Sequence, residues 1–209
     1  MRVAPEGRPF ILAAWVILGA LAAFRLWPAA LAWLPVAVWV VAFFRDPARP
    51  GPRGDRLVLA PADGLVVSVR EIHEPEFLGG TARRISIFMN VFDVHVNRYP
   101  ADGTVAFRRY VAGRFVNAAG EKASLENEQC SIGLETAHGR VLVRQIAGLV
   151  ARRIVTDHQP GQAARQGERM GLIRFGSRVD VFLPPGTTPR VREGDRTRAG
   201  QTVIAEWPA

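Results

Sequence analysis

The first 44 residues are far more apolar than the rest of the chain. No charged or strongly polar side chain occurs from Phe10 to Phe24, and none occurs from Leu26 to Phe44. Only Arg25 separates the two stretches, and Pro28 falls where the first turn of a second helix would lie, so its missing N–H costs little. The pattern predicts two apolar helices joined by a short turn, forming a hairpin over residues 1–46.

The two apolar stretches approach the length that a membrane requires. The first has 15 residues, about 22 Å as a helix, and the second has 19, against a hydrocarbon layer of about 30 Å. Arg residues flank the pair on both sides, which favours a hairpin with both ends in the cytoplasm. We expect a retained membrane anchor. Insertion into one leaflet and a buried helical pair of a soluble protein are the alternatives.

Beyond Phe44 the pattern changes to short strands. The segment 45–52 contains three Pro and one Gly and predicts a linker. Apolar and β-branched runs then alternate with Gly, Pro and Asp, which is typical of an antiparallel β-rich domain. The expected strands are Leu57–Ala60, Leu65–Val69, Arg84–Met89, Gly103–Tyr110, Ser131–Glu135, Arg140–Gly148, Arg178–Leu183 and Thr202–Glu206. Short helices are expected over Ala119–Leu125 and Ala163–Glu168.

The segment Val191–Val203 gives a hint about the architecture. Its strand and turn pattern resembles the closing strands of biotinyl and lipoyl carrier domains, which are barrel-sandwich folds. We therefore expect an α+β, β-rich protein, with a barrel-sandwich-like antiparallel β domain over residues 47–209 after the helical hairpin. A carrier of that kind needs a Lys at a hairpin tip. The single Lys, Lys122, falls in a helix-like stretch, so the carrier function is poorly supported.

Composition narrows the possible chemistry. The chain has 209 residues and a formal charge of +8, yet no basic run is interleaved with aromatic residues, so no nucleic-acid partner is expected. The single cysteine, Cys130, excludes an internal disulfide and a Cys-based metal cluster. No pair among the four His has the spacing of metal ligands on a helix, and no metal is expected.

His95 is the candidate base, because of the stretch in which it lies. Several polar residues crowd into nine positions among apolar ones, and buried polar groups need partners. Spacing alone leaves two interpretations equally open, a structural hydrogen-bond network and a functional cluster. The other polar members of the stretch are Asn90, Asp93, Asn97 and Arg98.

Ser177 is the candidate nucleophile. It follows Gly176 at the expected entrance of a strand, and a serine there becomes reactive when a base and a carboxylate support it. Asp63, in a Pro-Ala-Asp-Gly turn, is the candidate carboxylate. Its alternative role is to cap its own turn.

A series of short motifs, taken in order, resembles the short, archaeal-like type of phosphatidylserine decarboxylase proenzyme. Each motif is modest alone, and their joint order is specific. The matching stretches are 43–47, 61–64, the His95 stretch, 113–118, 122–128, 146–154, 167–171 and 175–178. The resemblance implies a pyruvoyl-dependent enzyme of phospholipid biosynthesis that converts phosphatidylserine to phosphatidylethanolamine and CO2. It also implies a location at the cytoplasmic face of the bacterial inner membrane, in contact with lipid.

The resemblance further implies self-cleavage between Gly176 and Ser177. The Ser177 hydroxyl would attack the Gly176 carbonyl, and β-elimination from the resulting ester would separate a large chain, 1–176, from a small chain, 177–209. The two chains would form a heterodimer. Ser177 would become a covalent pyruvoyl group, the only cofactor, which forms a Schiff base with the substrate. By resemblance, His95 is the base and general acid, and Asp63 is its orienting carboxylate.

The chain departs from part of the family at Arg98. Longer bacterial members have a second His three positions after the first, and Arg cannot act as a base at physiological pH. Either His95 serves both self-cleavage and turnover, or another group takes one role. Two other functions remain open: a membrane-anchored serine hydrolase that uses Ser177 without chain cleavage, and a non-enzymatic barrel-sandwich carrier or binding domain. The oligomeric state, including a higher oligomer, is also open.

Overall fold

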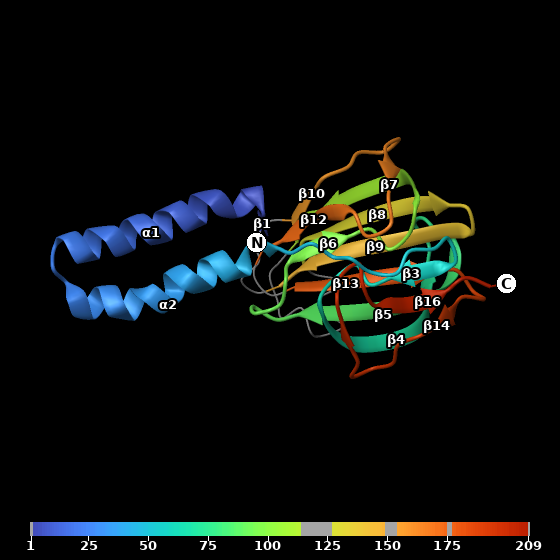
Figure 1. Cartoon of the computed structure of the whole chain (residues 1–209). Coiled ribbons are helices and arrows are strands. Elements are labelled where there is room, and N and C mark those ends of the chain that lie inside the picture. Colours follow the sequence, from blue (N-terminus) through green and yellow to red (C-terminus); the bar gives the residue numbers. More distant parts are fainter. Residues whose placement is uncertain (1, 114–126, 149–153, 175–176, 209) are drawn as a thin grey trace. The chain divides into compact units, whose positions relative to one another are not determined.

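The structure is a computed structural model of the whole chain, and it describes all residues except 1, 114–126, 149–153, 175–176 and 209 (Figure 1). The chain divides into two compact units, residues 1–48 and 49–209. The sequence pattern placed this boundary after residue 46.

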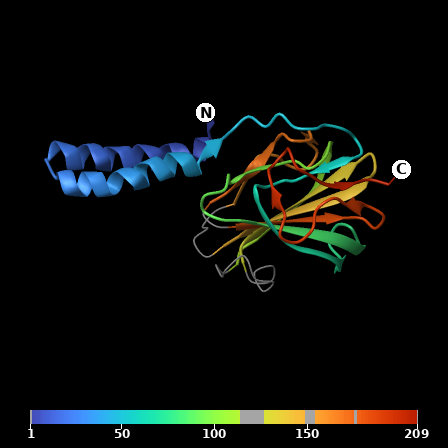
Figure 2. The same cartoon turned by 60° about the horizontal axis from the view of Figure 1, so that its bottom comes forward.

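The first unit is a hairpin of two apolar helices, α1 (Arg8–Ala23) and α2 (Trp27–Phe43), which run side by side (Figure 1 and Figure 2). A short 3-10 turn, Pro5–Gly7, precedes α1, and the two-residue strands β1 (Arg2–Val3) and β2 (Arg45–Asp46) pair antiparallel at the open end.

Two interactions hold the helices of the hairpin together. The indole N–H of Trp33 donates to the carbonyl oxygen of Ala14 across the pair, at 2.9 Å. The rings of Phe10 and Phe44 stack with centroids 5.4 Å apart. Arg25 makes the connection in a left-handed conformation, with φ of 58°.

The outer surface of the hairpin is apolar and exposed. Leu12, Val16, Leu31 and Val38 are each more than half exposed, whereas the buried side chains are mainly small alanines between the helices. Among the described residues, the helical stretch Pro5–Ala23, 19 residues long, is the one that is long and apolar enough to cross a membrane.

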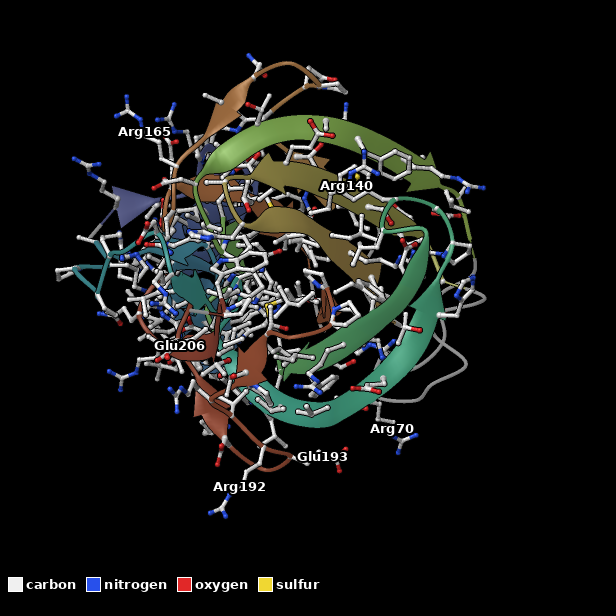
Figure 3. All side chains as sticks on the ribbon, turned by 90° about the vertical axis from the view of Figure 1, so that its right-hand side faces the viewer. Arg70, Arg140, Arg165, Arg192, Glu193 and Glu206 are labelled. Carbon is white, nitrogen blue, oxygen red and sulfur yellow. The ribbon has the colours of Figure 1, made fainter. Side chains whose placement is uncertain are left out.

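The second unit is built on one large antiparallel sheet in the order β11-β7-β8-β9-β13-β5-β4-β15. The sheet curls into a half-barrel, and Figure 3 looks along it, with the strands forming an open arc from β4 (teal) to β7 (yellow-green). Its strands are β4 (Gly64–Glu74), β5 (Gly80–Met89), β7 (Gly103–Val111), β8 (Gln129–Thr136), β9 (Gly139–Ala147), β11 (Ala163–Ala164), β13 (Ser177–Leu183) and β15 (Arg196–Thr197).

Two three-stranded sheets complete this unit. One has the order β10-β12-β6, and the other β14-β16-β3. Alternate residues of the large sheet meet these smaller sheets in one core, in which Ile87, Val179 and Tyr99 are fully buried. The strands are β3 (Leu57–Leu59), β6 (Val96–Arg98), β10 (Ile154–Thr156), β12 (Arg169–Ile173), β14 (Thr188–Pro189) and β16 (Val203–Glu206).

The predicted fold class is confirmed, and each of the eight expected strands is present within a few residues of its predicted bounds. The predicted helix over Ala163–Glu168 is wrong. Ala163 and Ala164 pair with the edge of β7 instead, and the chain then turns at Gly167, whose φ is 77°. The other predicted helix, Ala119–Leu125, lies outside the described residues.

Cys130 packs in the core as a small apolar residue. Its side chain is 1% exposed. Burial raises the pKa of its thiol, so the thiol stays protonated near neutral pH and is a poor nucleophile.

Candidate active site

Several strand ends meet at one end of the large sheet. Ser177 is the first residue of β13, and its partners on the two flanking strands are Met89, the last residue of β5, and Ala147, the last of β9. On the far side of β5, β4 begins at Gly64, just after Asp63. Neighbouring strands lie about 4.8 Å apart, so the start of β4 is two strand spacings from the start of β13.

Ser177 is completely buried. Because side chains alternate along a strand, Ser177 shares the core side of β13 with Val179, while Arg178 and Asp180 point to the other side. The hydroxyl oxygen of Ser177 has no hydrogen-bond partner among the described residues. A buried hydroxyl left in this state costs free energy, which fits a group held for a reaction.

His95 immediately precedes β6 and is also completely buried. Its carbonyl oxygen accepts a hydrogen bond from the backbone N–H of Ile173, four residues before Ser177 in the chain. Its ring atom Nδ1 lies 3.1 Å from the carbonyl oxygen of Asp93. A carbonyl oxygen only accepts, so Nδ1 bears the hydrogen and Nε2 of the neutral ring keeps the lone pair that a base needs.

Asp63 is bound from two directions. One carboxylate oxygen accepts from the guanidinium of Arg49 at 2.6 Å, and the other accepts from the backbone N–H of Ala199 at 2.7 Å. Both charged side chains are largely buried, with Arg49 9% and Asp63 14% exposed. Thus the structure brings Asp63 together with Arg49 and Ala199, and it brings His95 together with Asp93.

A buried amide pair lies beside Met89, the strand partner of Ser177, and the sequence analysis named one member, Asn97, but missed the other, Gln145. The side-chain amide of Gln145 donates to the side-chain oxygen of Asn97 at 2.7 Å, and Asn97 in turn donates to the sulfur of Met89 at 3.6 Å. Both amide side chains are fully buried. The signal in the sequence was a single Gln within the predicted strand Arg140–Gly148, where it lies between Arg144 and Ile146.

Arg98, at the position of the second His of longer family members, contacts the backbone. Its guanidinium donates to the carbonyl oxygen of Gly167 at 3.1 Å, and its own N–H donates to the carbonyl oxygen of Pro61 at 2.9 Å. The first contact ties β6 to the turn at Gly167, and the second ties it to the turn that contains Asp63.

An ion pair lies immediately after Ser177, on the other side of β13. Arg178 and Asp180 form two contacts of 2.9 Å, and their side chains are 2% and 0% exposed. A two-point contact of this kind fixes both side chains and stiffens the first residues of the strand.

A cavity of about 410 Å³ lies beside the candidate carboxylate. Its walls include both Asp63 and Asp93. Within the described parts of the chain, no group of three or more His, Cys, Asp and Glu side chains is arranged to hold a metal ion.

Comparisons with known proteins point to one family. Residues 36–205 match the family model described as phosphatidylserine decarboxylase. A protein of Symbiobacterium thermophilum named phosphatidylserine decarboxylase proenzyme is 50% identical over 207 residues, which cover 99% of this chain and 96% of that protein. Proteins of the same name from Aromatoleum aromaticum and Nitrosomonas eutropha are each 48% identical, over 99% and 98% of this chain and 96% and 95% of their own lengths.

Proposed function

Because the chain belongs to the phosphatidylserine decarboxylase family, we propose that it converts phosphatidylserine to phosphatidylethanolamine and CO2, after cutting itself between Gly176 and Ser177. The observation that supports this best is the state of Ser177. It is a fully buried serine at the first position of a central strand, and its hydroxyl has no hydrogen-bond partner among the described residues. The alternative functions, a serine hydrolase and a carrier, have no comparable support.

Self-cleavage uses groups of the chain itself. The Ser177 oxygen attacks the carbonyl carbon of Gly176, the bond to the Ser177 nitrogen breaks, and an ester replaces the amide. Loss of the Ser177 α-proton then expels the carboxylate of Gly176 and leaves a dehydroalanine, which water converts to a pyruvoyl group with release of ammonia. A serine hydroxyl is a weak nucleophile at neutral pH, so the first step needs a base.

His95 is the base in this proposal. Its Nδ1–H is oriented by the Asp93 carbonyl oxygen, so Nε2 can take the proton of a hydroxyl. The same nitrogen, once protonated, can return a proton to the α-carbon of the product. With Arg98 bound to backbone carbonyl oxygen, we assign both tasks to His95. We propose Asp63 as the carboxylate that supports His95. The contacts of Asp63 with Arg49 and Ala199 would hold that carboxylate in place in its turn.

Residue 177 fits a pyruvoyl group, because it is shielded from water at the start of a strand that pairs on both sides, with Met89 and Ala147 as its partners. When present, that group would supply the ketone that condenses with the substrate amine and accepts the electrons left by departing CO2. The buried amide pair of Asn97 and Gln145 would hold the floor of the site and exclude water.

The two chains would stay together as a heterodimer after cleavage. The small chain, 177–209, contains β13, which pairs with both β5 and β9 of the large chain. It also contains β15 and β16, which pair with β4 and β3. These ladders need no covalent link at residue 177.

We also propose that the helical hairpin binds the protein to the cell membrane at its cytoplasmic face. Its apolar side chains are exposed, and the stretch Pro5–Ala23 has the length and composition of a membrane span. This location would present the site to a lipid substrate.

Denaturing mass spectrometry tests the central step. The active protein is expected to give two chains, residues 1–176 and 177–209, with the small chain blocked at its N-terminus. Ser177→Ala should leave one uncut, inactive chain. Ser86→Ala is the matched control, because Ser86 is another buried serine of the same sheet without a partner among the described residues, and it should process normally. An active, intact chain of 22.9 kDa would reject self-cleavage.

A further inference from the structure

The cavity of about 410 Å³ lies next to the candidate catalytic residues. Asp93, one of its walls, contacts the His95 ring through its carbonyl oxygen. Its side chain also accepts from the backbone N–H of Asn90, the residue after Met89, which faces Ser177. The cavity is therefore beside the place where a substrate would react. Its described walls are Asp63, Asp93, Arg196, Thr197, Arg198 and Thr202.

The charges around the cavity leave one cation in excess. Asp63 is paired with Arg49 at 2.6 Å, and Asp93 is paired with Arg196 at 2.6 Å. The guanidinium of Arg198 makes no ion pair or hydrogen bond with any residue that the structure describes. One unneutralised guanidinium in a cavity attracts an anion.

A hydroxyl donor stands beside this cation. The Oγ1 atom of Thr202 accepts from the backbone N–H of Arg198 at 2.9 Å, which leaves its own O–H available to donate. The turn from Arg198 to Thr202 is held in place, since the N–H of Gly200, with φ of 70°, donates to the carbonyl oxygen of Ala60 at 2.8 Å. A guanidinium and a hydroxyl on a fixed turn form a suitable pair for oxygen atoms of an anion.

Resting on the proposed function, we propose that this cavity binds the phosphodiester of the phosphatidylserine headgroup, with Arg198 as its cation and Thr202 as a further donor. The headgroup has two anions, the phosphodiester and the carboxylate. The carboxylate loses its charge as CO2 leaves, so a cation bound to it would stabilise the ground state and slow the reaction. The phosphodiester keeps its charge throughout, so a cation there binds substrate and product equally without a penalty.

The test compares Arg198→Gln with Arg192→Gln. Arg192 is the matched control because it lies on the same C-terminal segment, outside the cavity walls, with its side chain 90% exposed and pointing into solvent (Figure 3). Isothermal titration of the processed protein measures binding of two soluble probes, glycerophosphoserine and glycerophosphoethanolamine. The second probe has the phosphodiester but no carboxylate.

We expect Arg198→Gln to weaken binding of both probes about tenfold, Arg198→Lys to retain part of the affinity, and Arg192→Gln to change neither. In turnover, KM for phosphatidylserine should rise while kcat changes little, and self-cleavage should be complete. Weaker binding of glycerophosphoserine alone would assign Arg198 to the carboxylate and overturn the proposal, as would unchanged binding of both probes. The same titration on uncut Ser177→Ala protein measures binding of both probes to the cavity. Its result does not depend on whether the protein cleaves itself or decarboxylates phosphatidylserine.

Discussion

Ser177 and Met89 face each other across β13 and β5, at the end of the sheet where Asn97 contacts the Met89 sulfur. The candidate nucleophile is therefore held by strand pairing on both sides, and a buried amide contacts one of its two strand partners. Chemistry at residue 177 is expected to depend on this rigid surrounding as much as on the base.

Substitution of His95 tests the assignment of the base. His95→Ala should slow self-cleavage by about 10²- to 10⁴-fold, because no group then takes the proton of the Ser177 hydroxyl. The conversion of the full-length band to two bands over time measures the rate. His73→Ala, in β4, is the control and should cleave at the normal rate. Normal processing of His95→Ala would show that another group is the base.

Asp63 and Arg49 form an ion pair. Substituting each partner in turn therefore separates the structural role of Asp63 from its proposed catalytic role. Asp63→Asn and Arg49→Gln should each lower the free energy of unfolding by about 2 kcal/mol, between the values for exposed and buried pairs. If the carboxylate supports His95, Asp63→Asn slows self-cleavage more than Arg49→Gln does at equal thermal stability. Equal rates in the two variants would limit Asp63 to holding the turn.

The buried pair of Arg178 and Asp180 gives a prediction for stability. Arg178→Met should lower the free energy of unfolding by about 3–5 kcal/mol, because it leaves the Asp180 carboxylate buried without a cation. The double variant Arg178→Met with Asp180→Leu should recover much of that loss. Both variants are made in the uncut Ser177→Ala protein, and urea unfolding measures the free energy of unfolding of each as a single chain. A single variant as stable as its parent would mean that solvent reaches Asp180.

Alkaline pH should destabilise the fold through two buried acids. Burial raises the pKa of Cys130 above its ordinary value of 9.0. Burial, and next the carboxylates of Asp157 and Glu168, raises the pKa of Tyr99 above 10.0. The unfolded chain therefore releases these protons first, so their stabilising contribution is complete below about pH 9 and is lost as the pH rises further.

This pH dependence can be measured by thermal unfolding of the uncut protein from neutral to alkaline pH. Tyr99→Phe and Cys130→Ala each remove one titrating group, so each variant should show a smaller decrease in stability on the alkaline side than its parent. An unchanged decrease in both variants would assign the effect to other groups.

Apolar and β-branched runs bounded by Gly, Pro and Asp predicted the long strands well, because β5, β8 and β9 each contribute several side chains to the core. It failed for Ala163–Glu168, where pairing with β7 outweighs the helix propensity of two alanines. Short strands such as β6 and β12 were missed. A run of three to five residues is too short to show a hydrophobic periodicity, and the pairing of these strands depends on partners that are distant in the sequence.

The candidate site was predictable only in its residue types. Ser177 was expected at a strand entrance, and it is the first residue of β13. The partners were not predictable, because Arg49 lies in a Pro-rich linker and Ala199 is 136 positions from Asp63. Such contacts arise when the strands assemble, and a single sequence has no local signal for them.

The central position of β13 has a consequence for refolding. If residue 177 is cut, the 33-residue small chain would supply β13 in the middle of the sheet, between β9 and β5 of the other polypeptide. Denatured mature protein would then need a bimolecular encounter to restore that strand, which the uncut precursor achieves within one molecule. Refolding of the mature protein would thus depend on its concentration. In dilute solution the two separated chains would not regain the fold that the precursor reached before cleavage.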